Sequence, residues 1–482
     1  MRWVLLAIAI YFTLAAVMRV VVSRTPELDE AEQVIQTQVW SWGYGPQPPL
    51  YTWVQKLFFS VTGVNIAGLA LLNGLILFGT CAVTYLAGKE LFGESAIGVS
   101  AALSLFFIPQ FVFAAQNDLT HSDMAIFFTA ATFLIVARLL RERTTTRYLA
   151  LGLIASAGIL SKYNYALLFV VLIVALLSWP DGRRLITDKR FVLAVVVLLL
   201  LLAPHLYWIR HHPELTFRKI PRLHASGEVS LLRSWADGFG MLAAAVFVYV
   251  LPLALAWVVA LGKAPLRAAV WKRDDVRATL LRRVLWFSLL LYVAAILLFR
   301  AKFKERWIQP NLYPLPLLVA FVMYPLMTAG RLKKVGVLAA VIGLGVSLTL
   351  GGRVVFAETT GKPFRQNMPY DEVARRLDSW HRPAAIIAEE NPLGAAFIMM
   401  FRGAPVLVPD EISPRFPPGP QLIVWEVDAQ NRNFERIVKF MEQRGVPRES
   451  FSRAQFIEAP LKYAPSKKLK AGYLIVPMSE SH

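Results

Sequence analysis

Long apolar runs separated by short polar turns dominate the chain. A membrane-spanning helix needs about 20 mostly apolar residues. Eleven stretches approach this length, at 3–23, 64–87, 97–115, 122–140, 148–160, 164–179, 191–209, 236–261, 284–300, 307–328 and 335–351. Ser161-Lys162-Tyr163 separates the two short stretches 148–160 and 164–179. These form either two spans, one long kinked helix or a re-entrant pair. The first stretch is longer than the apolar region of a signal peptide, and no clean cleavage site follows it, so we expect a retained span.

The charges of alternate loops differ, and this difference predicts the orientation. One set comprises Arg2, Lys89, 138–147, 183–190, 263–283 and 331–334, and it carries 20 Lys and Arg against 7 Asp and Glu. The opposite set carries 12 basic and 10 acidic residues. Because Lys and Arg accumulate in cytoplasmic loops, the first set is expected inside. The amino terminus then lies in the cytoplasm, and an odd number of spans places the carboxyl terminus outside.

Composition supports a membrane protein and removes several other classes. Of the 482 residues, 56% are hydrophobic and 17% charged, against about 45–50% and 25% in soluble domains. The net charge of +19 would suggest nucleic acid on a soluble protein, but most of it lies in the cytoplasmic turns and reflects topology. A single cysteine, Cys81, excludes a disulfide framework and a cysteine-based metal site.

From about residue 353 the composition becomes that of a small α/β domain. Short apolar stretches predict strands at Ala384–Ala388, Pro405–Val408, Gln421–Val427 and Tyr473–Val476, and amphipathic patterns predict helices at Asp371–Trp380 and Asn431–Arg444. Pro414–Pro420 is typical of a loop. No nucleotide motif or metal cluster is visible in the tail, so a lid or docking module is expected. We therefore predict a transmembrane domain over 1–352 and an extracytoplasmic domain over 353–482.

The first outer loop, at 24–63, is long and rich in aromatic residues. Loops of this length are usually functional. The stretches 31–42 and 49–60 fit short helices that lie at the membrane interface, with Trp and Tyr at headgroup depth.

Acidic residues outside the membrane gather in two places. Asp29 and Glu30, flanked by Glu27 and Glu32, follow the first span, and Asp118 and Asp123 lie at the outer ends of the third and fourth spans. Carboxylates near the membrane are costly and tend to mark function. The alternative for Asp29 and Glu30 is helix capping, as it is for Ser122-Asp123.

Basic residues outside the membrane also cluster, against the positive-inside tendency. Arg300, Lys302, Lys304 and Arg306 lie within seven residues, and Lys162 stands between two spans. Such a cluster suggests an anionic ligand such as a phosphate, and the alternative is ordinary anionic headgroups. The 210–224 loop adds Arg210, His211, His212, Arg218, Lys219, Arg222 and His224. A metal could bind His211-His212, but no second pair supports one, which favours solvated histidines.

Carboxylates and cations at one outer face suit a specific chemistry. A carboxylate takes a proton from a hydroxyl nucleophile, and Arg and Lys stabilise the charge on a departing lipid phosphate. No nucleotide is needed, in keeping with the absence of a nucleotide motif.

Four elements, in order along the membrane part, resemble those of the membrane-embedded GT-C glycosyltransferases. They are Glu27–Ala31 (ELDEA), Gly45–Leu50 (GPQPPL), Gly158–Tyr163 (GILSKY) and Lys302–Pro310 (KFKERWIQP). The third element is similar to that of the rhizobial lipopolysaccharide galacturonosyltransferase branch. Relatives include protein O-mannosyltransferases and the lipid A aminoarabinose transferase.

The resemblance implies a polyprenyl-phosphate-sugar donor, inverting transfer on the outer face, Asp29 as the catalytic residue and Glu30 as its neighbour. Gln47 stands where many relatives have His or Lys. Asp123 matches the family's second acidic loop only loosely, and Asp118 is the other candidate for that position.

These observations predict an inner-membrane enzyme that transfers a sugar to a hydroxyl of a cell-envelope acceptor, such as lipopolysaccharide, a glycan, a lipid or a protein. No tightly bound cofactor is expected, although Asp29 and Glu30 permit a divalent metal. The rivals are a transporter or flippase and a non-enzymatic envelope assembly protein. Catalytic candidates are Asp29, Glu30, Asp123 and Asp118; donor-phosphate candidates are Lys162, Tyr163, Lys302, Lys304, Arg306 and Arg300; substrate or lipid candidates are Gln47, Pro48, Tyr51, Trp53, His211 and His212.

Overall fold

The computed structural model describes residues 2–118, 120–217, 230–262, 275–380, 383–401, 403–412, 414, 417–430 and 432–478. It divides into two compact units. The first comprises Met1–Thr13, Gly45–Tyr51 and Asn73–Val346, and the second comprises Leu14–Tyr44, Thr52–Leu72 and Ser347–His482. The second unit therefore contains most of the first outer loop as well as the tail. The expected domains, 1–352 and 353–482, assign that loop to the transmembrane domain instead.

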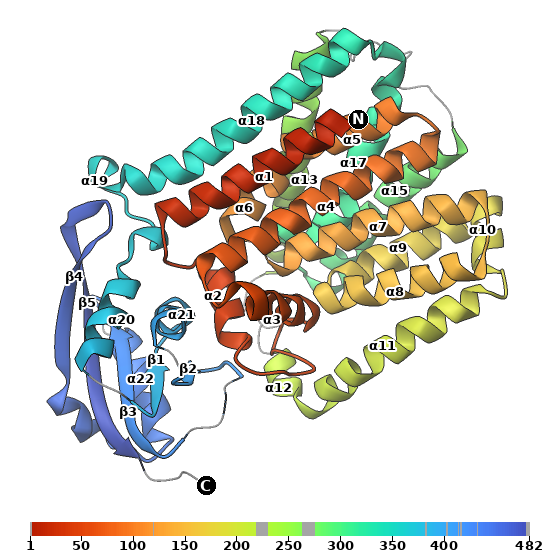
Figure 1. Ribbon diagram of the computed structural model, residues 1–482. Helices are drawn as coiled ribbons and strands as arrows, with labels where there is room; N and C mark the ends of the chain where they lie inside the picture. Colours follow the sequence, from red (N-terminus) through yellow and green to blue (C-terminus); the bar gives the residue numbers. More distant parts are fainter. Residues whose placement is uncertain are drawn as a thin grey trace. The chain divides into compact units, whose positions relative to one another are not determined.

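The first unit is helical (Figure 1). It contains the start of α1 (Arg2–Val22), most of α4 (Ile66–Phe92), and the start of α18 (Ala329–Val355). Between α4 and α18 lie α5 (Ser95–Ser104), η1 (Leu105–Phe107), η2 (Gln110–Ala114), α6 (Ala115–Asp118), α7 (His121–Arg141), α8 (Thr145–Ser161), α9 (Tyr165–Leu177), α10 (Pro180–Ile186), α11 (Phe191–His211), α12 (Pro213–Thr216), α13 (Leu231–Leu261), α15 (Val276–Phe299), α16 (Glu305–Leu312), α17 (Pro314–Met323) and η5 (Tyr324–Leu326).

Seven of the helices in the described residues are long and apolar enough to cross a membrane, which confirms a polytopic membrane protein but not the expected count of eleven spans. A bent pair, Ser95–Phe107 and Gln110–Asp118, meets at 72° and would make an eighth. The expected spans 148–160 and 164–179 are the shorter helices α8 and α9. The expected span 307–328 is divided into α16, which contains Pro310, α17, which begins at Pro314, and η5. Pro314 has no N–H to continue the hydrogen bonding of α16, so a new helix begins there.

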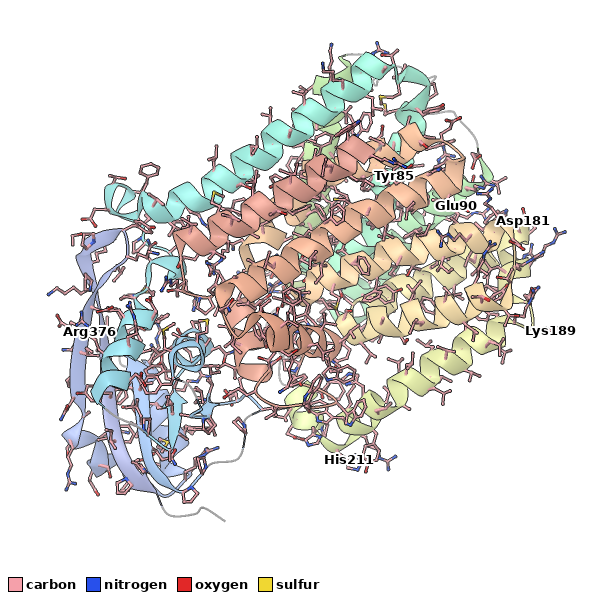
Figure 2. All side chains as sticks on the ribbon, viewed as in Figure 1. Tyr85, Glu90, Asp181, Lys189, His211 and Arg376 are labelled. Carbon is pink, nitrogen blue, oxygen red and sulfur yellow. The ribbon has the colours of Figure 1, made fainter. Side chains whose placement is uncertain are left out.

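Helix α8 packs against both α7 and α11 in the first unit (Figure 1). Charged residues gather at one end of these helices, where Arg141 pairs with Glu90 at 2.9 Å. Figure 2 shows Glu90, Asp181 and Lys189 at that end and His211 at the other. The two ends of the helices thus carry different sets of loops, as the alternation of charge along the sequence predicts.

The second unit is built on a mixed five-stranded sheet of order β2-β1-β3-β5-β4. Strand β1 (Ala385–Ala388) is parallel to β2 (Val406–Leu407) and β3 (Gly419–Glu426). Strand β5 (Ala464–Met478) runs antiparallel to β3 and to β4 (Gln455–Leu461). The remaining elements are α19 (Ala357–Thr360), η6 (Arg365–Asn367), α20 (Tyr370–Trp380), α21 (Asn391–Met400), α22 (Arg432–Glu442) and η7 (Arg448–Arg453).

Alternate residues of β1 and β3 point into two hydrophobic clusters, because successive strand side chains face opposite ways. Ile386 and Leu422 pack with residues of α20 and α21, whereas Ile387, Ile423 and Trp425 pack with residues of α22. The α/β tail is confirmed, as are the four expected strands and two expected helices. The sequence did not reveal β4, in which Pro460 breaks the pattern, or α21, which is nearly all apolar and therefore shows no amphipathic period.

The first outer loop forms α2 (Leu28–Gln36) and α3 (Leu50–Thr62). All six residues from Ala31 to Gln36 are buried. Ala31 and Val34 pack with Phe59 of α3, and Ile35 joins the cluster that contains α21. The predicted helix at 31–42 is therefore present only in its first half, as the buried helix α2, and the rest is an irregular segment. The predicted helix at 49–60 is α3.

Gly394 allows α21 to lie close to α2. A Cβ atom added there would lie 2.9 Å from Cγ2 of Val408 and 3.0 Å from Cδ1 of Ile35. We expect Gly394→Leu to lower the free energy of unfolding by about 1–3 kcal/mol through overpacking, seen as a lower Tm of the purified protein. Gly240→Leu in α13 is the control, because no heavy atom lies within 4 Å of its added Cβ. Equal Tm values for the two variants would contradict this packing.

Candidate active site

A run of buried polar residues begins α7 in the first unit. His121, Ser122 and Asp123 are only 3%, 4% and 2% exposed. Thr120, and not Ser122 or Asp123, is the N-cap residue, so the capping alternative for Ser122-Asp123 was wrong. Burying three consecutive polar side chains is costly unless they are bonded or used. Their position at the start of an apolar helix therefore makes this run a candidate functional site.

Lys162 reaches this run from the turn between α8 and α9. Its Nζ donates a hydrogen bond to Oγ of Ser122, and Nδ1 of His121 lies 3.2 Å from the carbonyl oxygen of Ser161. The third sequence element and the start of α7 thus form one cluster. It combines a cation, a hydroxyl, an imidazole and the Asp123 carboxylate.

Gly158 fixes the shape of this turn. A Cβ atom at Gly158 would overlap the Tyr165 ring, so only glycine lets that ring pack against α8. The Tyr165 hydroxyl lies 2.5 Å from Oγ1 of Thr132 on α7. The glycine in the GILSKY element is therefore a packing requirement that holds Lys162 beside α7.

Tyr163 begins a ladder of stacked rings along α11. Its hydroxyl lies 3.0 Å from Nε2 of His205, and the two rings stack at 5.8 Å between centroids. Trp208 stacks on His205 at 6.2 Å, and His212 stacks on Trp208 at 4.7 Å. Tyr163 thus faces aromatic rings, which suit the apolar face of a lipid or sugar better than a phosphate.

The histidine pair is not arranged as a metal site. Each histidine directs Nδ1 to the backbone carbonyl oxygen of the residue one helical turn earlier. His211 Nδ1 lies 2.8 Å from that of Tyr207, and His212 Nδ1 lies 3.0 Å from that of Trp208. The two rings contact different neighbours, Tyr207 and Trp208 respectively. Arg218, Lys219, Arg222 and His224 lie outside the described residues.

The fourth sequence element, Lys302–Pro310, contacts the turn that carries Lys162. Nδ2 of Asn164, two residues after Lys162, donates to the carbonyl oxygen of Trp307 at 2.7 Å. Lys304 lies over the Trp307 ring, with Nζ 5.9 Å from the centroid, and Arg306 is half-buried in α16. Helix α16 also packs against α7 and α9. Lys304 and Arg306 are therefore carried by the element that touches the Lys162 turn.

The other two basic candidates are placed differently. Nζ of Lys302 is paired with Oδ2 of Asp237 at 2.9 Å, a partner on α13 that the sequence did not reveal. Arg300 is exposed and ends α15 in the left-handed conformation, with φ at 53°. Lys304 is exposed as well, but it contacts Trp307, whose carbonyl oxygen binds Asn164 beside the Lys162 turn. The candidate phosphate-binding set is therefore Lys162, Lys304 and Arg306.

Of the remaining candidates in the first unit, one has a contact with the cluster of Lys162 and the His121-Ser122-Asp123 run. The ring of Tyr51 lies 5.3 Å from that of His121, so the GPQPPL element leads directly to the buried polar run. Pro48 is buried and Gln47 is half-buried. Asp118 is the last residue of α6 and is half-buried, unlike the fully buried Asp123.

In the second unit the two adjacent acidic candidates differ sharply. Oε2 of Glu30 accepts hydrogen bonds from Nη2 of Arg19 at 2.6 Å and from the backbone N–H of Glu27 at 2.8 Å. Glu27 and Glu30 form a capping box at the start of α2, as the capping alternative predicts for Glu30. Arg19 supplies the positive charge that a metal would bring, so the surroundings of Glu30 suit a guanidinium better than a metal ion.

Asp29 lies in the first turn of α2 and is half-buried. Glu27 forms two long ion pairs. Its Oε1 lies 3.9 Å from Nη2 of Arg353, and its Oε2 lies 3.9 Å from Nε of Arg365. Burial and the charge of Glu30 raise the pKa of Glu27, against the effect of the three arginines Arg19, Arg353 and Arg365. Trp53 of α3 donates from Nε1 to the carbonyl oxygen of Ser41 at 2.8 Å, which anchors the loop after α2.

Removing the Glu30 charge should affect folding more than chemistry. Arg19 and Glu30 are only 10% and 13% exposed, and removing one partner of a buried pair costs about 3–5 kcal/mol. We expect Glu30→Gln to lower the Tm clearly. The conservative control is Asp371→Asn on α20, which removes a carboxylate whose partner Arg375 is more than half exposed. An unchanged Tm for Glu30→Gln, together with lost activity, would assign Glu30 a chemical role instead.

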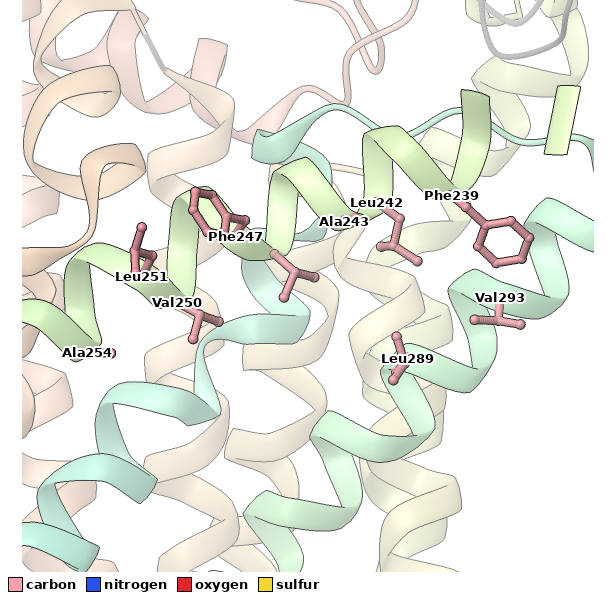
Figure 3. Close-up of a pocket in the computed structure, with 10 residues that line it drawn as sticks. Phe239, Leu242, Ala243, Phe247, Val250, Leu251, Ala254, Leu289 and Val293 are labelled. Carbon is pink, nitrogen blue, oxygen red and sulfur yellow. The ribbon is translucent and has the colours of Figure 1, made fainter. Parts of the chain in front are cut away.

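An apolar groove lies on α13 and α15 of the first unit (Figure 3). It has a volume of about 660 Å³, and its lining is wholly hydrophobic, including Phe239, Phe247, Leu289 and Val293. Without a polar group it fits hydrocarbon and cannot fix a phosphate or sugar.

Known proteins resemble this chain in sequence and in structure. The family model of dolichyl-phosphate-mannose-protein mannosyltransferase matches residues 46–208. The lipopolysaccharide core galacturonosyltransferases RgtB and RgtA of Rhizobium johnstonii are each 33% identical to it. The RgtB match covers 88% of this chain and 87% of the relative, and the RgtA match covers 87% and 86%. The crystal structure of ArnT from Cupriavidus metallidurans bound to undecaprenyl phosphate superposes with a TM-score of 0.63 over 98% of both chains, at 14% identity.

The structural likeness shows the GT-C fold of membrane-embedded glycosyltransferases. The chain belongs to the GT-C glycosyltransferase family that contains the rhizobial lipopolysaccharide core galacturonosyltransferases. It is a multi-pass membrane glycosyltransferase, which sets aside the transporter and assembly-protein alternatives.

Proposed function

We propose that the protein transfers a sugar from a polyprenyl-phosphate donor to a hydroxyl group of a lipopolysaccharide-type acceptor at the periplasmic face of the inner membrane. The sugar proposed is galacturonic acid, because RgtA and RgtB are named for its transfer. ArnT, which shares the fold, was crystallised with undecaprenyl phosphate bound, a lipid of the class that the proposed donor would release after transfer.

The observation that carries this proposal is the cluster around Lys162. It joins a lysine to the buried His121-Ser122-Asp123 run, and the hydrogen bond between Asn164 and Trp307 joins it to the element bearing Lys304 and Arg306. Lys162 follows the apolar helix α8, and Lys304 and Arg306 lie at the start of α16. These three cations suit a lipid phosphate, because charge-assisted hydrogen bonds to phosphate are among the strongest in proteins.

The proposed reaction is a single displacement. The acceptor oxygen forms a bond to the anomeric carbon as the bond from that carbon to the phosphate oxygen breaks, and the electron pair leaves with the polyprenyl phosphate. Asp29 takes the proton of the acceptor hydroxyl. Lys162, Lys304 and Arg306 stabilise the charge that grows on the phosphate. One displacement inverts the anomeric configuration.

A direct transfer assay tests this proposal. Purified protein in lipid nanodiscs is given polyprenyl-phosphate galacturonic acid and a core lipopolysaccharide acceptor, and products are followed by mass spectrometry. We expect a mass gain of one galacturonic acid on the acceptor and release of polyprenyl phosphate, with the inverted linkage seen by NMR. Transfer of a different sugar from the same lipid class would correct the sugar only, whereas transfer from a nucleotide sugar alone would overturn the donor class.

A further inference from the structure

Three carboxylates of the second unit meet at the carboxyl ends of two neighbouring parallel strands. Glu389 and Glu390 directly follow β1, and Glu426 ends β3. Each offers an oxygen, and these oxygens all lie within 4.8 Å of one another. The amino-acid sequence places Glu426 far from the other two, so the pairing of β1 with β3 creates the cluster.

This position is where sheets of this type bind ligands. From β1 the chain passes through α21 to β2 on one side, while β3 lies on the other side of β1. The strand order therefore reverses between β1 and β3. In open α/β sheets, ligands bind outside the carboxyl ends of the strands at such a switch point.

One carboxylate oxygen of Glu389 is buried without a hydrogen-bond partner among the described residues. Glu389 is fully buried at 0% exposure. Its Oε2 accepts the backbone N–H of Glu426 at 3.1 Å, but Oε1 has no hydrogen-bond partner among the described residues. A buried carboxylate oxygen left unbonded is costly, so a ligand shared with Glu390 and Glu426 would account for it.

The surroundings leave negative charge to be neutralised. Tyr370 donates its hydroxyl to Oε2 of Glu426 at 2.7 Å and to Oε1 of Glu390 at 3.5 Å. Nη1 of Arg365 lies 3.6 Å from Oε1 of Glu390 and supplies one positive charge. Arg436 also acts on Glu390 electrostatically. Glu389 has no ion pair of its own among the described residues, so its charge is the least compensated.

We propose that Glu389, Glu390 and Glu426 bind a divalent cation of the Ca²⁺ type, with Tyr370 holding two of the three carboxylates in place. Carboxylate oxygens are the ligands that Ca²⁺ takes in proteins. The site is separate from the transfer chemistry proposed above, and no residue is common to both.

The cation site would stabilise the helix that carries Asp29. Arg365 contacts both Glu390 at 3.6 Å and Glu27, the N-cap residue of α2, at 3.9 Å. A cation bound by Glu390 would leave Arg365 more available to Glu27. Ca²⁺ should therefore raise the Tm of the second unit without entering the reaction.

Equilibrium dialysis with ⁴⁵Ca²⁺ tests the proposal on the full-length protein in detergent, after treatment with EDTA. We expect one saturable site per chain in the wild type and at least a tenfold weaker Kd in Glu390→Gln/Glu426→Gln. Glu449→Gln, a change of an exposed carboxylate in the same unit, should bind like the wild type. Ca²⁺ should raise the Tm of the wild type and of Glu449→Gln but not that of the double variant.

Two results would overturn the site. The first is a wild type that binds no Ca²⁺ at millimolar concentration, in which case a proton is the occupant; burial and Glu390 do raise the pKa of Glu389 well above its ordinary value. The second is a double variant that binds Ca²⁺ as the wild type does. If the double variant fails to fold in EDTA, the single variant Glu390→Gln takes its place, because Glu390 is already 30% exposed.

Discussion

Asp29→Asn should lose at least about 100-fold in kcat while the protein stays folded. Positioned general bases contribute about 10²- to 10⁴-fold, and asparagine keeps the shape of the side chain but cannot accept the proton. The measurement is transfer from the lipid-linked donor by purified protein in nanodiscs. Donor affinity should change little, because the phosphate-binding cations lie in other elements.

The adjacent carboxylate supplies the matched control. Glu30→Gln should lower the Tm through loss of the buried Arg19 pair, whereas Asp29→Asn should melt within a few degrees of the wild type. Opposite effects at neighbouring positions would separate chemistry from capping. Turnover like that of the wild type in Asp29→Asn would remove Asp29 from the reaction.

Lys162→Met should lower kcat/KM by roughly 10- to 150-fold. This fold-change corresponds to the about 1.5–3 kcal/mol that a hydrogen bond to a charged group contributes. Methionine keeps most of the apolar stem and removes the ammonium that donates to Ser122. Because the phosphate gains charge as the bond breaks, the loss should appear in both donor binding and kcat. Binding is measured with radiolabelled polyprenyl phosphate, and kcat by the transfer assay.

Lys189→Met is the matched control for this change. Lys189 is exposed and lies at the end of the helices opposite His211 (Figure 2), so its loss should leave kcat/KM unchanged. A similar decrease in both variants would mean that lost surface charge, and not phosphate binding, explains the Lys162 result.

The sequence predicted what is encoded locally. Apolar runs predicted the long helices and the alternating turns, and short apolar stretches predicted four strands of the sheet. The expected count of eleven spans was not confirmed, because α8 and α9, with 17 and 13 residues, are shorter than the about 20 residues that a span needs, and the segment 307–328 is divided into three short helices. Hydropathy records that a segment is apolar but not whether lipid or protein surrounds it.

The charged residues of the candidate site stand out in the sequence, whereas the residues that they contact do not. Asp29 and Glu30 look equivalent in the sequence, but the structure distinguishes them through the contacts of Glu30 with Arg19, eleven residues earlier, and with the backbone of Glu27. Asp123 was a candidate, but His121 and Ser122 were not, because burial of polar residues cannot be seen in a linear pattern. The contact from Asn164 to Trp307 spans 143 residues, a separation at which no local rule applies.

The carboxylate cluster of the tail shows the same limit. Glu389-Glu390 is an ordinary acidic pair in the sequence, and Glu426 is an isolated residue. Their meeting depends on the register in which Ala388 of β1 pairs with Val424 of β3.

The discontinuous second unit also sets an order of events during synthesis. Helix α2 is made early, but α21, against which it packs, begins only at Asn391. At about 5–20 residues per second, the ribosome needs roughly 20–70 s to make the intervening chain. During this time the Asp29 helix lacks its final neighbour, while the membrane helices are already emerging. A message cut short after the last span would therefore yield an inserted protein whose first outer loop never reaches its final structure.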